Sequence, residues 1–173
     1  PTTMAAVLSY LREPAKGVAP FVRVPLTAAY WLNVCGDGCD WAAAAETYPD
    51  LSGQYRKLVK NMVANWTHEG VVVVLDLHWN DDSSTTQSMA TKGTNEAGDV
   101  TASAIEFWDN VSATFASNDM VFYELYNEPH IDSFDSWSAG DDTYAGMLEL
   151  YESVRANAPE AMILIAGQTS YAY

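Results

Sequence analysis

The sequence contains little positive charge, little cysteine and no long hydrophobic run. Only 8 of its 173 residues are lysine or arginine, against 23 aspartates and glutamates, so the formal net charge is −15. Proteins that bind nucleic acids or anionic membranes neutralise phosphates with basic side chains, so this balance argues against both partners. Apolar runs such as residues 71–75 are far below the roughly 20 residues that a membrane-spanning helix needs. A neutral ligand remains compatible with the charge.

The composition is that of one globular unit. Hydrophobic residues make up 49% of the chain and aromatic residues 12%, which is enough for one sizeable core and excludes intrinsic disorder. We therefore treat residues 1–173 as one domain. The chain starts at Pro1 without a signal peptide and stops shortly after an apolar segment. We expect it to be a piece of a longer polypeptide.

Two cysteines, Cys35 and Cys39, stand in the turn-forming stretch Cys-Gly-Asp-Gly-Cys. Their spacing allows a small disulfide, which would indicate an exported, extracellular protein; the alternative is two free thiols. A metal site is not expected, because two thiolates without nearby partner ligands do not complete a tetrahedron.

Apolar segments with strand character alternate with amphipathic helical segments. The strand-like segments are residues 21–26, 71–78, 120–127 and 162–167, rich in β-branched and aromatic side chains. Helical spacing of apolar residues predicts helices over residues 4–11, 51–69, 101–115 and 144–158. Such alternation is typical of βαβ units with a parallel sheet, and the nearly continuous apolar character favours strands covered on both faces.

The spacing of the strands indicates half of a closed barrel. Each βα unit takes about 47 residues, so eight units need about 375, within the range of a (β/α)₈ barrel, and this chain holds four. A doubly wound open sheet is the alternative, but it would usually carry a glycine-rich phosphate turn, which is missing. Long polar loops follow the strands at 27–50, 79–100 and 128–143, where α/β proteins build their sites.

Charged side chains within the apolar strands are candidates for the site. Alternation places Glu124 and Glu128 on one face of their strand and Asp76 and His78 on one face of theirs. Arg23 lies in an apolar run and needs an anionic partner, for which Glu128 or Glu124 is the natural candidate. We expect Arg23, Asp76 and Glu124 to form an internal network, and Glu128, at the carboxyl end of a strand, to be a site residue.

Four stretches in sequence order resemble glycoside hydrolase family 5. Residues 120–130, MVFYELYNEPH, are similar to the acid/base signature of that family, in which an apolar strand ends in Asn-Glu-Pro. Residues 21–26 (FVRVPL), 74–79 (VLDLHW) and 163–173 (ILIAGQTSYAY) resemble neighbouring strands of the same barrel. The resemblance covers the whole chain and implies strands two to five of a TIM (β/α)₈ barrel.

The resemblance also implies roles for individual residues. Glu128 matches the general acid/base, and Asn127 matches the residue that holds the sugar 2-hydroxyl group. His78 matches the histidine of the third strand that lines the cleavage point. Arg23 matches the arginine of the second strand that supports the catalytic carboxylates.

Three aromatic or imidazole side chains are further candidates for substrate binding. Tyr30 and Trp79 lie in the loops after strands, where sugar rings could stack, although ordinary packing within the loops would explain them as well. His130 follows Pro129 and either reaches the ligand or packs locally.

The resemblance implies a retaining glycosidase of which this chain carries only one of the two catalytic carboxylates. Such enzymes use an acid/base and a nucleophile about 5–5.5 Å apart, and the family's nucleophile is a glutamate on the seventh strand, which this chain does not contain. We therefore expect an endo-acting cellulase for β-1,4-glucan, with no cofactor and no metal. The alternative is a half-barrel that pairs with a second copy, forms a homo-oligomer and binds glycans with little or no catalysis.

Overall fold

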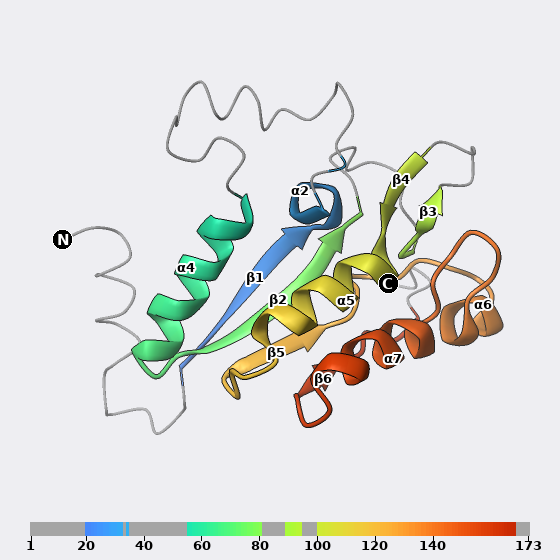
Figure 1. Cartoon of the computed structure of the whole chain (residues 1–173). Coiled ribbons are helices and arrows are strands. Elements are labelled where there is room, and N and C mark those ends of the chain that lie inside the picture. The colour runs from blue at the N-terminus through green and yellow to red at the C-terminus, as the bar shows by residue number, and fades with distance from the viewer. Residues whose placement is uncertain (1–19, 33, 35–54, 81–88, 95–99, 169–173) are drawn as a thin grey trace.

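The computed structural model describes residues 20–32, 34, 55–80, 89–94 and 100–168 (Figure 1). The helix predicted at 4–11 and both cysteines, Cys35 and Cys39, lie outside the described residues, so the predicted disulfide stays a prediction.

The centre of the fold is a four-stranded parallel sheet. Its strands are β1 (Phe21–Thr27), β2 (Val72–Trp79), β5 (Val121–Glu124) and β6 (Ile163–Leu164), and they lie side by side in chain order. Every neighbouring pair is parallel. These are the four strands predicted from the sequence, in the order expected of half a barrel.

Three helices cover one face of this sheet (Figure 1). They are α4 (Tyr55–His68), α5 (Ala104–Phe115) and α7 (Met147–Asn157). Each helix turns apolar side chains at helical spacing toward the sheet, and together with the strands they form one hydrophobic core. These three predicted helices are confirmed, with ends that differ from the predicted ones; α5 begins at Ala104 because the Ser103 hydroxyl accepts a hydrogen bond from the Glu106 N–H at 3.3 Å. No described helix is long and apolar enough to cross a membrane.

The opposite face of the sheet is largely uncovered in the described part of the chain. Along β1, Val24 and Leu26 are buried toward the helices, whereas Phe21, Arg23 and Pro25 alternate with them and are exposed. The expectation that both faces are covered is therefore wrong for β1. The uncovered face also carries the polar side chains that the sequence placed within the strands.

Short elements occupy the loops that follow the strands. They are α2 (Ala28–Leu32), the antiparallel hairpin of β3 (Lys92–Thr94) and β4 (Val100–Ser103), and α6 (Phe134–Ala139). The Lys92 N–H donates to the Thr143 carbonyl at 2.9 Å, and the Ala145 N–H donates to the Ala90 carbonyl at 2.8 Å. The loop after β2 is thus tied to the loop after β5, at the carboxyl end of the sheet.

The central strand supplies the first testable prediction. Leu75 is completely buried in β2, while Leu148 on α7 is 54% exposed. Leu75→Ala should lower the free energy of unfolding by about 2–5 kcal/mol, because it leaves a cavity in the core. Leu148→Ala, the matched control, should change it by about 0.5 kcal/mol or less. Urea unfolding of both variants measures the difference, and equal losses would contradict the core described here.

Candidate active site

The candidate site lies toward the carboxyl ends of β2 and β5, and a long side chain from the neighbouring strand β1 reaches it. β1 contributes Arg23, β2 contributes Asp76 and His78, and β5 contributes Glu124. The register pairs Asp76 with Glu124, so these two carboxylates project from the same face of the sheet. Arg23 pairs with Val74, two residues before Asp76, and its long side chain extends toward the two carboxylates.

Arg23 joins three acceptors from different parts of the chain. Its Nε donates to Glu124 Oε2 at 2.6 Å and its Nη2 donates to Glu124 Oε1 at 2.9 Å, a two-pronged pairing that fits the planar guanidinium. Nη2 also donates to Asn127 Oδ1 at 2.9 Å and lies 3.0 Å from Asp76 Oδ2. The hydrogen bonds to Glu124 are the main reason why the pKa of Arg23 is raised. Of the two partners proposed from the sequence, Glu124 makes the contact.

A second set of contacts closes a ring of side chains. Asp76 Oδ2 lies 2.6 Å from His78 Nδ1, and His78 Nε2 lies 3.4 Å from Asn127 Nδ2. Because Asn127 also accepts from Arg23, the four residues Arg23, Asp76, His78 and Asn127 form a closed ring, which we call the Arg23 ring. This confirms the expected internal network and adds Asn127 and His78 to it.

Burial dominates the protonation of Asp76. Its side chain is completely buried, which raises the pKa of its carboxyl from 3.8 to about 6; the hydrogen bond from His78 and the charge of Arg23 oppose this rise. Sequence reasoning gave Asp76 no place in the site beyond an internal network. The signal was its position two residues before His78, which places both side chains on one face of β2.

Glu128 stands outside the Arg23 ring and faces solvent. Its side chain is 68% exposed, and its backbone has φ of 44°, the only positive φ among the described residues other than glycine. A non-glycine residue rarely adopts this left-handed conformation. Such backbone is held in place by its surroundings and clusters at functional sites.

The remaining predicted residues divide into two groups. His130 lies next to the acid, with its Nε2 3.9 Å from Glu128 Oε2, and Trp79 packs edge-on against His78 with ring centres 4.0 Å apart. Both therefore lie beside the candidate site residues, and their roles in binding stay predictions. Tyr30 instead packs edge-on against Tyr55, with ring centres 5.7 Å apart, as ordinary packing of the loop predicts.

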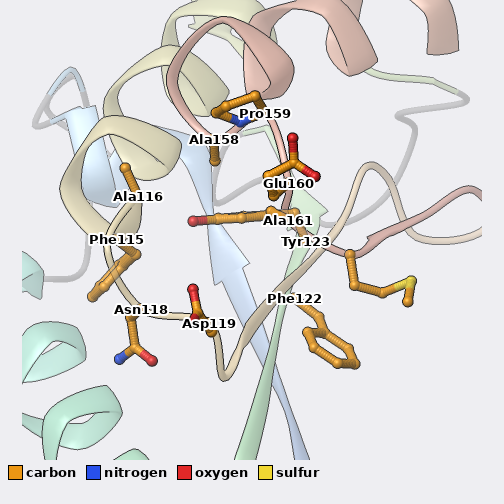
Figure 2. Close-up of a pocket in the computed structure, with 11 residues that line it drawn as sticks. Phe115, Ala116, Asn118, Asp119, Phe122, Tyr123, Ala158, Pro159, Glu160 and Ala161 are labelled. Carbon is orange, nitrogen blue, oxygen red and sulfur yellow. The ribbon is translucent and has the colours of Figure 1, made fainter.

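A separate pocket of about 610 Å³ opens at the other end of the sheet (Figure 2). Its walls include Asn118 and Asp119, just before β5, and Pro159 and Glu160, just before β6. It therefore lies at the amino ends of these strands, away from Glu128. Within the described ranges, no group of three or more His, Cys, Asp or Glu side chains is arranged to hold a metal ion.

Comparison with known proteins identifies the family. Residues 15–173 match the family model described as cellulase, glycosyl hydrolase family 5. The chain belongs to glycoside hydrolase family 5. No curated protein sequence gives a significant match to this family 5 chain.

Solved structures similar to this family 5 chain include endoglucanases. XacCel5A in complex with cellopentaose has a TM-score of 0.60 and 18% identity, over 95% of this chain and 44% of that chain. The endocellulase of the archaeon Pyrococcus horikoshii has a TM-score of 0.56 and 19% identity, over 94% and 44%. An endoglucanase from an uncultured bovine rumen ciliate has a TM-score of 0.55 and 18% identity, over 93% and 40%. The family 5 chain is thus a partial TIM barrel that spans less than half the length of these structures.

The buried carboxyl of Asp76 predicts how stability depends on pH. Its folded-state pKa of about 6 lies above the ordinary value of 3.8, so the folded chain holds this proton more tightly. The stability that results is complete below about pH 4 and is lost as the pH rises through about 6, a change of about 3 kcal/mol. Relative to Asp76→Asn, which does not titrate, the wild type should lose this amount between about pH 4 and pH 7.

Urea unfolding at several pH values measures this difference. Asp135→Asn, which removes an exposed carboxylate from α6, is the matched control. The prediction fails if the stability curves of the wild type and Asp76→Asn run parallel.

Proposed function

We propose that this chain carries the acid/base half of a retaining glycosidase that cleaves β-1,4-linked glucans such as cellulose. The observation that carries the proposal is the position of Glu128. It is an exposed carboxylate that directly follows Asn127, and Asn127 is fixed by the Arg23 ring. A carboxyl group held this way has open access to a glycosidic oxygen.

In the proposed double displacement, Glu128 first protonates the leaving oxygen and then takes a proton from the attacking water. Asn127 would hold the sugar 2-hydroxyl group, and His78 would line the cleavage point, with Arg23 supporting both. Glu124 is held by Arg23 and Asp76 is buried, so neither carboxylate suits the role of nucleophile. The nucleophile would come from polypeptide outside these 173 residues.

Two observations support a neutral glucan as the substrate. XacCel5A was crystallised with cellopentaose, and a variant of the Thermobifida fusca endoglucanase was crystallised with cellotetraose. The chain itself is strongly acidic, and Trp79, which is 37% exposed beside His78, offers a ring for sugar stacking. This carboxylate chemistry needs no cofactor or metal. An extracellular location and a disulfide between Cys35 and Cys39 are part of the same proposal.

The acid/base role predicts a selective loss of activity. In a polypeptide that contains this chain and the nucleophile, Glu128→Gln should lower the rate of cellopentaose hydrolysis by about 10²–10⁴-fold. The first step with 2,4-dinitrophenyl β-cellobioside should be affected far less, because 2,4-dinitrophenolate leaves without protonation. Hydrolysis rates and a pre-steady-state burst of dinitrophenolate measure the two effects.

Glu152→Gln is the matched control, because Glu152 is an exposed glutamate on α7. It should leave both rates unchanged. Equal losses with the two substrates, or an unchanged rate of cellopentaose hydrolysis in Glu128→Gln, would contradict the assignment of the acid/base.

A second function is favoured by the exposed apolar side chains of the sheet. Phe21 on β1 is 64% exposed, and Met162 and Ile165, which flank β6, are 56% and 49% exposed. Two copies of the chain could bury these side chains by pairing about a twofold axis into an eight-stranded barrel. The two Glu128 residues would then lie four strands apart, directly across the barrel.

This alternative predicts a dimer that binds glycans and hydrolyses them slowly or not at all. Light scattering on the 173-residue chain, with a carboxymethylcellulose assay on the same sample, tests it. A monomer would exclude the paired half-barrel, and hydrolysis that disappears in Glu128→Gln would show that the pair has a working site.

A further inference from the structure

Among the described residues, the polar contacts of the buried Asp76 carboxylate all involve one oxygen. Oδ2 lies 2.6 Å from His78 Nδ1 and 3.0 Å from Arg23 Nη2. The other oxygen, Oδ1, is buried and has no hydrogen-bond partner among the described residues. Because buried carboxylates usually satisfy both oxygens, this arrangement is costly.

The neighbours of His78 determine which of its nitrogens carries the proton. Arg23 can only donate, so the side-chain oxygen of Asn127 must face it, and the amide NH₂ group must face His78. Since that NH₂ group is a donor, His78 Nε2 has to be the acceptor. The proton of the neutral imidazole then lies on Nδ1, where it donates to Asp76.

We infer that Asp76 is a positioning residue that fixes the tautomer of His78 and, through it, the orientation of the Asn127 amide beside Glu128. Neutralising the charge of Arg23 does not explain why a buried carboxylate stands at position 76, because Glu124 already pairs with Arg23 through two hydrogen bonds. Without Asp76, a proton on His78 Nε2 would face the NH₂ group of Asn127, donor against donor. The catalytic consequence rests on the proposed role of Glu128, whereas the tautomer itself does not.

Long-range ¹H–¹⁵N spectra of the imidazole rings, recorded on the full chain without substrate, measure the tautomer directly. At about pH 8 an ordinary imidazole is neutral. The chain has only 3 histidines, so His68→Gln and His130→Gln assign the signals. In the wild type, His78 should be protonated on Nδ1. Asp76→Leu removes the acceptor and should move the proton largely to Nε2.

Two further variants separate positioning from simple packing. Asp76→Asn should keep the Nδ1 proton, because its amide oxygen can take the place of the shared oxygen. Glu124→Gln should also keep it, because Glu124 accepts its hydrogen bonds from Arg23 and, among the described residues, not from His78. In a polypeptide that contains this chain and the nucleophile, Asp76→Leu should lower kcat for cellopentaose hydrolysis by about 100-fold, with a smaller change in KM.

A wild-type His78 protonated on Nε2 overturns the inference, and this result does not depend on whether a variant of Asp76 folds. An unchanged tautomer in Asp76→Leu also overturns it, as does a changed tautomer with an unchanged kcat. If the tautomer shifts as expected while Glu128→Gln still hydrolyses cellopentaose normally, the proposed acid/base role fails and the assignment of Asp76 to the tautomer stands.

Discussion

The site depends on one guanidinium group, that of Arg23. It contacts Glu124 on β5, Asp76 on β2 and Asn127 just after β5, while its own backbone belongs to β1. An arginine stays charged and presents its donors in a fixed plane, so it can serve three acceptors from two other strands without adjusting its protonation. Arg23 lies on the face of the sheet that the helices leave uncovered. Its side chain is therefore held by these hydrogen bonds and ion pairs rather than by packing in the core. The carboxyl ends of three strands are therefore joined by one side chain.

The Arg23 ring contrasts with Glu128, the exposed carboxylate that follows Asn127. The backbone before Glu128 is anchored on both sides: the Leu125 N–H donates to the Leu164 carbonyl, the Asn127 N–H donates to the Leu77 carbonyl, and Trp108 Nε1 donates to the Leu125 carbonyl. Such anchoring can hold Glu128 in its left-handed conformation. Glu128 thus projects its carboxylate beyond the Arg23 ring, where His130 Nε2 lies 3.9 Å from Glu128 Oε2.

Sequence patterns predicted the strands, their order and the polar side chains within them, because apolar segments and two-residue alternation are local properties. Alternation alone put Asp76 and His78 on one face. The ring that joins them to Asn127 could not be predicted in this way, since Arg23 starts beside Val74 and reaches upward only through its side chain. The short strand β3 and the packing of Tyr30 against Tyr55 also depend on tertiary contacts that no local pattern encodes. The left-handed backbone of Glu128 likewise depends on tertiary contacts and could not be predicted from a local pattern.

The arrangement explains how half of the proposed two-carboxylate site can be ordered by itself. Every member of the Arg23 ring comes from three neighbouring strands or the residues directly after them, so the ring needs no group from the rest of a barrel. The ring projects from the face of the sheet that the three helices leave open. In the proposed enzyme, the nucleophile would have to approach Glu128 across this same face, and Glu128 is the carboxylate that the ring leaves unengaged. The acid is therefore organised in advance, and the distance to its partner would be set by closure of the barrel.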